Sequence, residues 1–247
     1  MRENMSERKI YNLIIDEEFS RLIAPLSPSQ YAELEQKIIS HNYNPPITIW
    51  NRIIIKGLAE YEIYHKHKIS FYVKEISFSS RCEAIINITS ESIKRNDISD
   101  ELYRYCVGKM YDAAKNKMEL LYPHQNQYTP VSQRRPGYDN NRQTTSQLLG
   151  EQLHLSNGCV YKYGVYSRAI DTIFNKTPSI AQKILTGTFH VSLENTIELS
   201  KLSKEEITVI YEHVIIDNNN QLLYSIIQKN RLSEKERNKL IKKRKQK

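Results

Sequence analysis

The sequence has little of what marks secreted, membrane or metal-binding proteins. Its three cysteines, Cys82, Cys106 and Cys159, are an odd number in unrelated contexts, which argues against a disulfide framework and for buried thiols in a reducing cytoplasm. No apolar run approaches the ~18 residues of a membrane helix, and the first residues lack the apolar core of a signal peptide. The seven histidines do not cluster, so no metal site is expected. Because long apolar runs are lacking, no membrane insertion is expected either.

The net charge of +8 is concentrated at the C-terminal end of the chain. Residues 229–247 hold ten Lys or Arg and two Glu, while the other 26 basic and 26 acidic residues cancel. A solvated chain end in a lysine-rich protein has this composition, and so does an electrostatic anchor for a polyanion. The charge alone leaves both interpretations open.

The first half of the chain alternates between strand-like and helix-like segments, and the 247 residues suffice for one large domain or two small ones. Ser27, Pro28 and Gln30 form the signature of a capped helix start. Apolar patterns predict strands at 11–16, 47–50, 52–56 and 71–78. Helices are predicted from 27, 57 and 80, and over 100–121. The pattern predicts a mixed α/β unit.

Residues 122–143, YPHQNQYTPVSQRRPGYDNNRQ, interrupt this pattern with three prolines and many amides. They are expected to form a linker or exposed loop, to which Arg134, Arg135 and Arg142 give positive charge. Beyond it strand signals nearly vanish. Helices are predicted at about 144–154, 156–175, 178–186, 192–200 and 203–212, with a final pair at 219–229 and 232–245.

The stretch SQLLGEQLHLSNGCVYKY, residues 146–163, has the spacing of a helix-turn-helix. Gly150 is the small residue that a close crossing of the two helices needs. Apolar residues fall where the two helices would bury their shared face, at Leu149, Leu153, Leu155, Val160 and Tyr163. The second helix would be capped by Ser156 and would expose Asn157, Gly158, Tyr161 and Lys162 to a major groove. Ser146 and Gln147, at the start of the first helix, would meet the phosphate backbone.

His154 stands in the turn, where glycine is usual because the backbone there favours a positive φ. Histidine adopts that conformation more readily than bulky residues do. An ordinary helical hairpin would show apolar residues at the same spacings. The small residue, the cap and the polar outer face together favour DNA binding.

Two regions of the sequence together resemble one known family. Three segments resemble the N-terminal domain of ParB-like proteins: LIAPLSPSQYAELEQKI, NPPITIWNRIIIKGLAEYEIYHKHKISF and SRCEAIINITSESIKRNDIS. The helix-turn-helix, followed by YGVYSRAIDTIFNKTPSIAQKILTGTFHVSLENTIELSKLSKEEI, resembles the central DNA-binding domain of the same family. The similarity extends over roughly residues 12–210 and lies in the order of elements more than in single residues.

This resemblance implies an α+β fold with a defined order of parts. An N-terminal mixed α/β, ParB/sulfiredoxin-like domain would be followed by a linker, an all-α helix-turn-helix domain and a helical C-terminal segment with a basic tail. The expected limits of these four parts are 1–121, 122–143, 144–212 and 213–247. The resemblance further implies a homodimer that binds double-stranded DNA in the bacterial cytoplasm, associated with the nucleoid or a plasmid.

Many ParB-like proteins use the N-terminal domain as a CTP-operated switch, and the resemblance locates its two motifs here. The first, an Asp-Gly-His-Asn-Arg-Tyr-like string in related proteins, reads Lys56-Gly57-Leu58-Ala59-Glu60-Tyr61. The glycine and tyrosine are retained, but the acid is a lysine and the arginine is a glutamate. The second, Glu-Asn-x-x-Arg, reads Glu91-Ser92-Ile93-Lys94-Arg95, with serine in place of asparagine.

A triphosphate needs cations and backbone N–H groups directed at it. Glutamate in place of arginine at position 60 changes the local charge by two units. One charge pair at ~4 Å is worth about 4 kcal/mol at a surface-like dielectric, and here its sign is unfavourable. The expectation is a retained fold with CTP binding lost or strongly weakened, and no cofactor; CTP with Mg²⁺ is the alternative.

The leading hypothesis is a sequence-specific DNA-binding protein, acting in plasmid or chromosome partition or as a regulator on a mobile element. Partition would require a partner ATPase, and MRENMSERKIYN shows no convincing arginine-rich recruitment motif. In this hypothesis the helix-turn-helix reads base edges, and phosphates are bound by linker and tail cations, including Arg134, Arg135, Arg142, Lys242, Lys243, Arg244 and Lys245.

Two other functions remain open. The first is a ParB-fold enzyme, a CTPase or nuclease. Sulfiredoxin-like chemistry would need a cysteine between Gly57 and Glu60, where there is none, and Glu60 and Glu62 face different ways on a helix instead of clustering for a metal-dependent nuclease. The second is a protein-interaction adaptor whose helix-turn-helix no longer reads DNA.

Overall fold

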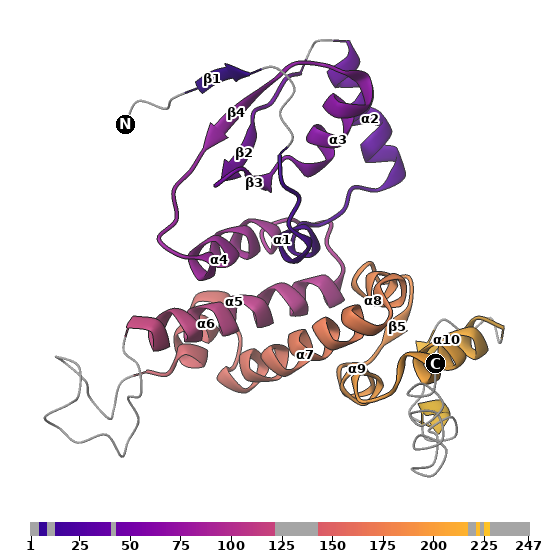
Figure 1. Ribbon diagram of the computed structural model, residues 1–247. Helices are drawn as coiled ribbons and strands as arrows, with labels where there is room; N and C mark the ends of the chain where they lie inside the picture. Colours follow the sequence, from indigo (N-terminus) through magenta and orange to yellow (C-terminus); the bar gives the residue numbers. More distant parts are fainter. Residues whose placement is uncertain are drawn as a thin grey trace, which may run out of the picture. The chain divides into compact units, whose positions relative to one another are not determined.

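The computed structural model describes residues 5–8, 13–40, 43–121, 143–216, 221–222 and 225–227 (Figure 1). These residues form a small sheet with helices around it, followed by a series of helices. The predicted α+β class is confirmed. In the described part of the chain, no helix combines the length and the apolar character needed to cross a membrane.

The N-terminal elements build a mixed sheet in the strand order β1-β4-β2-β3. β2 pairs antiparallel with β3 and parallel with β4, while β1 pairs antiparallel with β4. In chain order the elements are β1 (Met5–Arg8), α1 (Glu17–Leu22), α2 (Pro28–Ile39), β2 (Ile47–Trp50), β3 (Ile53–Lys56), α3 (Leu58–His67), β4 (Phe71–Glu75) and α4 (Arg81–Ser92).

Local signals in the sequence determine most of these boundaries. The capping box at α2 is formed as predicted, with the Ser27 N–H donating to Gln30 Oε1 at 2.8 Å and the Gln30 N–H donating to Ser27 Oγ at 3.2 Å. The tight connection between β2 and β3 uses two residues with positive φ, Asn51 at 48° and Arg52 at 67°, as two-residue hairpins require.

The strand predicted at 11–16 is wrong over its described part. Ile14 makes only a single bridge to Ile53. Asp16 instead caps α1, because its Oδ1 accepts the N–H groups of Glu18 and Phe19, both at 3.0 Å. A side chain that satisfies two free N–H groups starts a helix where the apolar pattern alone suggested a strand.

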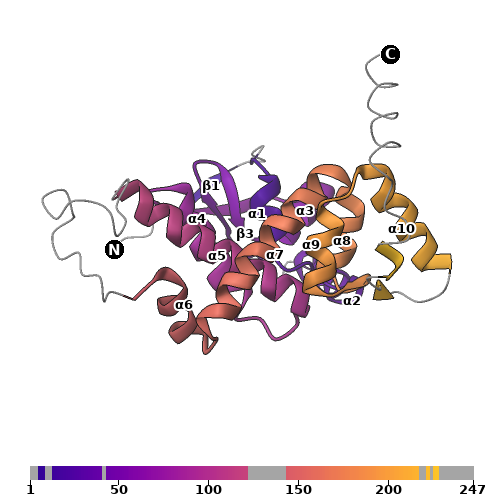
Figure 2. The same ribbon diagram turned by 90° about the horizontal axis from the view of Figure 1, so that it is seen from below.

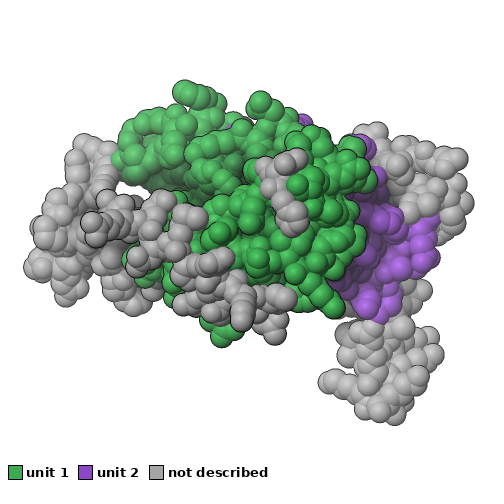
Figure 3. Space-filling view, turned by 90° about the horizontal axis from the view of Figure 1, so that it is seen from above, with its two compact units in different colours: residues 1–98, 109–161 green, residues 99–108, 162–247 purple. Residues whose placement is uncertain are grey.

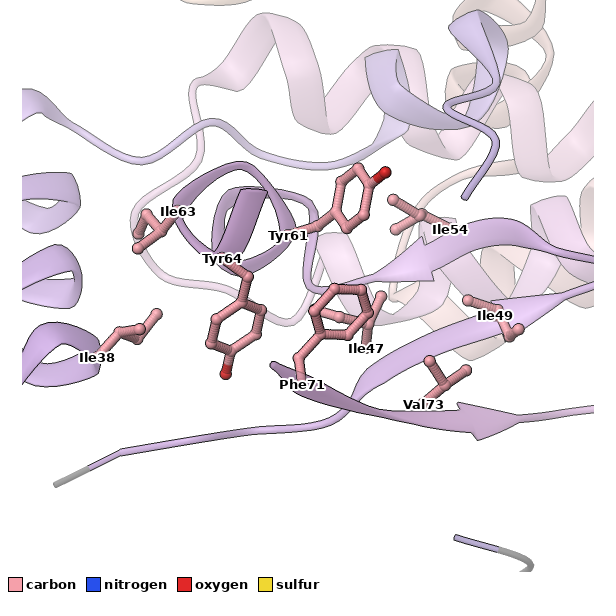
Figure 4. Packing of buried hydrophobic residues seen from close by; sticks show 9 residues of the cluster. All are labelled: Ile38, Ile47, Ile49, Ile54, Tyr61, Ile63, Tyr64, Phe71 and Val73. Atoms are coloured by element: carbon pink, nitrogen blue, oxygen red, sulfur yellow. The ribbon is translucent and has the colours of Figure 1, made fainter. Parts of the chain in front are cut away.

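One face of the sheet packs against α2 and α3 around stacked aromatic rings (Figure 4). Tyr64 lies parallel to Phe71 with ring centroids 5.3 Å apart, and Tyr61 meets the same ring edge-on at 5.8 Å. The Tyr64 hydroxyl donates to the Pro45 carbonyl at 3.0 Å. The core cluster comprises Ile38, Ile47, Ile49, Ile54, Tyr61, Ile63, Tyr64, Phe71 and Val73.

The remaining elements are mostly helical, and the helices predicted at 100–121, 144–154, 156–175, 178–186, 192–200 and 203–212 are confirmed within a few residues at each end. They are α5 (Asp100–Leu121), α6 (Thr145–Leu153), α7 (Asn157–Lys176), α8 (Pro178–Leu185), β5 (His190–Val191), α9 (Leu193–Ser200), α10 (Lys204–Ile216) and β6 (Gln221–Leu222).

The C-terminal helix predicted at 219–229 is wrong at its start. Residues 221–222 form β6, which pairs parallel with β5, so pairing with another segment overrides the local helical pattern. A helical turn follows at 225–227, and there Ile227 is buried, with 2% of its surface exposed. This part of the C-terminal segment therefore folds back onto the body. The helix predicted at 232–245 lies outside the described residues.

The described residues pack into two compact units, shown in different colours in Figure 3. Unit 1 comprises 1–98 and 109–161, and unit 2 comprises 99–108 and 162–247. Both α5 and α7 contribute to each unit. The domain limits proposed from the sequence stay a prediction.

Within unit 2, α5 and α7 touch backbone to backbone at Gly108. A Cβ at this position would lie 2.1 Å from the Tyr163 carbonyl oxygen and 2.8 Å from Ser167 Cβ. Neither helix can retreat without breaking the packing around it, so only glycine fits at this crossing. Nothing in the sequence marks Gly108, because a glycine inside a helical pattern usually just lowers helix propensity.

Replacing Gly108 with alanine is expected to lower the free energy of unfolding by about 3 kcal/mol, the upper end of the usual cost of overpacking. The matched control is Gly158→Ala in α7, where a Cβ would meet only Ser156 Oγ at 3.9 Å. That control should be neutral or stabilise the protein by up to about 1 kcal/mol. Urea unfolding followed by circular dichroism measures the free energy of unfolding of both variants. Equal stability of the two variants would contradict the close approach of α5 and α7 at Gly108.

Candidate nucleic-acid interface

The helix α6 begins at a capping box that includes Gln147, one of the two residues predicted to meet the phosphate backbone. Thr144 and Gln147 form a capping box, in which the Thr144 N–H donates to Gln147 Oε1 at 2.7 Å and the Gln147 N–H donates to Thr144 Oγ1 at 3.3 Å. Ser146 is half-buried, and its hydroxyl lies 3.0 Å from Thr144 Oγ1. Gln147 therefore uses its oxygen in the cap, and only its amide nitrogen is left to reach a phosphate.

Figure 2 shows the turn that joins α6 to α7. Its backbone has the positive φ that was predicted at His154. His154 ends α6 with a φ of 55°, the left-handed conformation expected there. The chain then passes so close to α6 that a Cβ at Gly150 would lie 2.6 Å from the Leu155 carbonyl oxygen. The Leu155 N–H donates to the Gly150 carbonyl at 2.8 Å. Gly150 is thus required by this close approach.

The first turn of α7 presents polar groups to solvent. Ser156 caps this helix, since its Oγ accepts the Cys159 N–H at 3.2 Å. The predicted outer-face residues Asn157, Gly158, Tyr161 and Lys162 are all exposed, and Tyr161 has 56% of its surface accessible.

The helix pair is anchored in unit 1 by an apolar cluster that it shares with two other helices. Leu149 of α6 and Val160 of α7 are buried with Met110 and Tyr111 of α5. Partly buried residues packed against them include Leu153 and Leu155 of the helix-turn-helix, together with Ile86 and Ile93 at α4. The fifth apolar position predicted for this face, Tyr163, is half-buried.

Sequence reasoning missed an acid beside the turn. Glu151 lies on α6 and accepts a hydrogen bond from Gln143 Nε2 at 2.5 Å. Residues 144–162 carry only this acid and the base Lys162, so with His154 neutral this stretch has no net formal charge. A phosphate-binding surface normally carries an excess of Lys and Arg. The cations predicted to supply it, Arg134, Arg135, Arg142, Lys242, Lys243, Arg244 and Lys245, lie outside the described residues.

The backbone conformation and the close packing of the turn between β3 and α3 both explain why it contains a glycine. Gly57 has a φ of 92°, and a Cβ there would lie 3.0 Å from Ile47 Cδ1 on the neighbouring strand. The same position is 3.8 Å from Glu60 Oε2, so the carboxylate folds back over the turn. An acid in the first turn of α3 interacts favourably with the helix N-terminus. The retained tyrosine, Tyr61, belongs to the sheet core.

The second motif holds the chain between α1 and α2. Ser92 Oγ donates to the Leu22 carbonyl at 2.5 Å, and Arg95 Nη1 donates to the Ala24 carbonyl at 2.9 Å. The other donors of Arg95, Nε and Nη2, pair with the two carboxylate oxygens of Asp97, both at 2.8 Å. This hydrogen bonding, followed by that from Gln30, lowers the pKa of Asp97 to about 2.

Among the six predicted nucleotide residues, Glu60 lies close enough to Arg95, and Lys56 close enough to Glu91, for their charges to interact. The Asp97 hydrogen bond and, to a smaller extent, the charge of Glu60 raise the pKa of Arg95. The pKa of Glu91 is lowered mainly by Lys94, 2.9 Å away, and last by the charge of Lys56. Arg95 is therefore directed at protein carboxylates, the groups with which a phosphate would have to compete.

Two observations on the described residues concern the metal and thiol chemistry of the enzymatic alternatives. Among them, no group of three or more His, Cys, Asp or Glu could hold a metal ion. Cys106 is fully buried, and burial raises the pKa of its thiol to about 12. A thiol with this pKa stays protonated at neutral pH and is a poor nucleophile.

Comparison with known proteins gives structural neighbours alone, because no protein-family model and no curated protein sequence matches the chain. One similar solved structure is the C2221 form of a Pnob8-like ParB-N domain, which is 17% identical in sequence. The match covers 88% of this chain and 85% of that chain, with a TM-score of 0.42. Another is a pNOB8-like ParB N-domain, which is 15% identical in sequence. The match covers 92% of this chain and 94% of that chain, with a TM-score of 0.43. Both come from the family that the sequence resembles.

Proposed function

We propose that this chain is a sequence-specific DNA-binding protein of the ParB type, acting in partition or as a regulator on a mobile element. The α6–α7 helix pair is the reading head, and the basic residues of 122–143 and of the tail supply sequence-independent affinity. In this proposal Asn157, Tyr161 and Lys162 contact base edges, while Ser146 and Gln147 adjoin the phosphate backbone.

The observation that carries this proposal is the geometry around Gly150. The close approach of Leu155, the left-handed His154 and the cap at Ser156 together orient α7 against α6. An ordinary helical hairpin requires none of these three features at these positions. The result is an exposed N-terminal turn on the second helix, which is the part of a helix-turn-helix that enters a major groove.

The N-terminal part is proposed to be a ParB-like domain whose nucleotide switch is degenerate. Glu60 lies over the glycine turn, and Arg95 is held by Asp97. The domain can therefore keep its fold without an anion at the turn. The sequence resemblance favours a homodimer, and a partition role would add a partner ATPase.

A protein-interaction adaptor is the second candidate, and two observations favour it. Residues 144–162 have no net formal charge, and the same stretch exposes two large apolar side chains, Leu148 at 49% and Tyr161 at 56%. Tyrosine is a common anchor in protein interfaces, and an exposed leucine beside it adds apolar surface. The DNA-binding experiments below separate the two candidates.

The Asn157→Ala, Lys162→Ala double variant should bind the cognate duplex at least about tenfold more weakly, because each base contact is worth about 1–3 kcal/mol. Genome-wide DNA capture with the intact protein identifies that duplex, and fluorescence anisotropy measures the affinity. Lys37→Ala is the matched control, since Lys37 is exposed on α2 and pairs with Glu33 at 2.6 Å. If no duplex is captured, or if both variants bind alike, the adaptor is favoured.

Deleting residues 229–247 should weaken binding to all duplexes alike and flatten its dependence on salt, because ten cations are removed. The deletion begins beyond the buried Ile227, so the body should keep its stability. A variant with the same ten residues changed to glutamine separates charge from length. A change in site preference would show that the tail does more than bind phosphates.

Isothermal titration of the intact protein with CTP and Mg²⁺ should give no saturable heat in the micromolar range. Glu60→Arg should bind CTP more tightly than the unmodified chain, because it exchanges a repulsive charge for an attractive one at the turn. Micromolar CTP binding by the unmodified protein would show that the switch is intact.

A further inference from the structure

A shallow hollow lies beside the turn of the helix pair, entirely within unit 1. Its lining consists of Gln147, Gly150, Glu151, His154, Leu155 and Asn157. Two of these residues, Gln147 and Asn157, are among those proposed to contact DNA. The hollow therefore lies between the helix that would adjoin the phosphate backbone and the start of the helix that would reach base edges. Any duplex docked on this surface has to pass over it.

Glu151 gives this hollow its negative charge. The residue is exposed, and among the described residues its side chain accepts a hydrogen bond from the Gln143 side chain. As the only acid in residues 144–162, it sets the sign of the charge beside the turn. An ionised carboxylate accepts hydrogen bonds and donates none, so it cannot bind a phosphate oxygen.

The stability of α6 does not explain why residue 151 carries a carboxylate. The residue stands in the last turn of the helix, where the macrodipole disfavours an acid, and that turn holds no basic residue. Glutamine has a similar shape and helix propensity and could accept the same hydrogen bond. The carboxylate thus costs the helix a little stability or none, and its charge acts on whatever approaches the hollow.

We propose that Glu151 is a specificity-determining residue that weakens the binding of this protein to unrelated DNA sequences. This inference rests on the proposed function. In the matched register, base contacts from Asn157 and Tyr161 hold the duplex so that no phosphate enters the hollow. On unrelated sequences these base contacts do not form, so the duplex can tilt or shift on this surface. A phosphate that then approaches the carboxylate is repelled, which weakens binding to unrelated sequences. Residues 144–162 have no net formal charge, so their sequence-independent binding is weak and the base contacts decide the affinity.

The test compares Glu151→Gln with the intact chain on the captured duplex and on a scrambled duplex, at several salt concentrations. Binding of Glu151→Gln to the scrambled duplex should tighten by about tenfold, and to the captured duplex by about twofold or less, so the specificity ratio falls. Glu151→Lys should lower the ratio further. Glu62→Gln is the matched control, because it removes one exposed acid from α3 in the same unit and should leave the ratio unchanged.

Stability and binding together separate the possible failures. The unfolding midpoint of Glu151→Gln should equal or exceed that of the intact chain, so a change in the ratio cannot come from misfolding. If the intact chain prefers the captured duplex but Glu151→Gln leaves the ratio unchanged within twofold, the role of Glu151 is refuted while the proposed function stands. If the intact chain binds no duplex, both are refuted.

Discussion

Close approach of one backbone segment to another is the constraint on which this structure depends. At Gly108 a side chain would lie 2.1 Å from a carbonyl of α7, and at Gly150 it would lie 2.6 Å from the carbonyl of the turn. At Gly57 both the left-handed backbone and Ile47 exclude a Cβ. Three of only seven glycines thus determine how α3 leaves the sheet, how α5 crosses α7, and how α6 turns into α7.

The α6–α7 helix pair packs against helices that precede it in the chain. Val160 and Leu149 pack with residues of α4 and α5 in one apolar cluster, although residues 122–143 separate the segments along the chain. The far end of α4 carries Ser92, which binds a carbonyl of α1, and is followed by Arg95. The α4 segment therefore contacts both the apolar cluster of the α6–α7 helix pair and the chain that leads from α1 to α2, so the helix pair depends on the N-terminal part for its stability.

Features encoded by a few neighbouring residues could be predicted, and features that join distant segments could not. The capping box at Ser27 and the left-handed turn at His154 are local, and the structure has both. Apolar periodicity located most helices within a few residues for the same reason. The pairing of residues 221–222 with β5 and the crossing at Gly108 depend on which segments meet, which no local pattern specifies. At the candidate site, exposure of Asn157 and Lys162 followed from helical spacing, whereas the hollow beside Glu151 arises only when α6, the turn and α7 are assembled.

The burial of Ile227 sets a limit on where the basic tail can act. About 20 residues follow this fixed point, and a fully extended chain of that length reaches at most ~70 Å. Under the proposed function, the tail can neutralise phosphates only within roughly two helical turns of the duplex, at ~34 Å per turn, from its point of attachment. Phosphates farther from Ile227 than this reach are therefore beyond the tail of the same molecule.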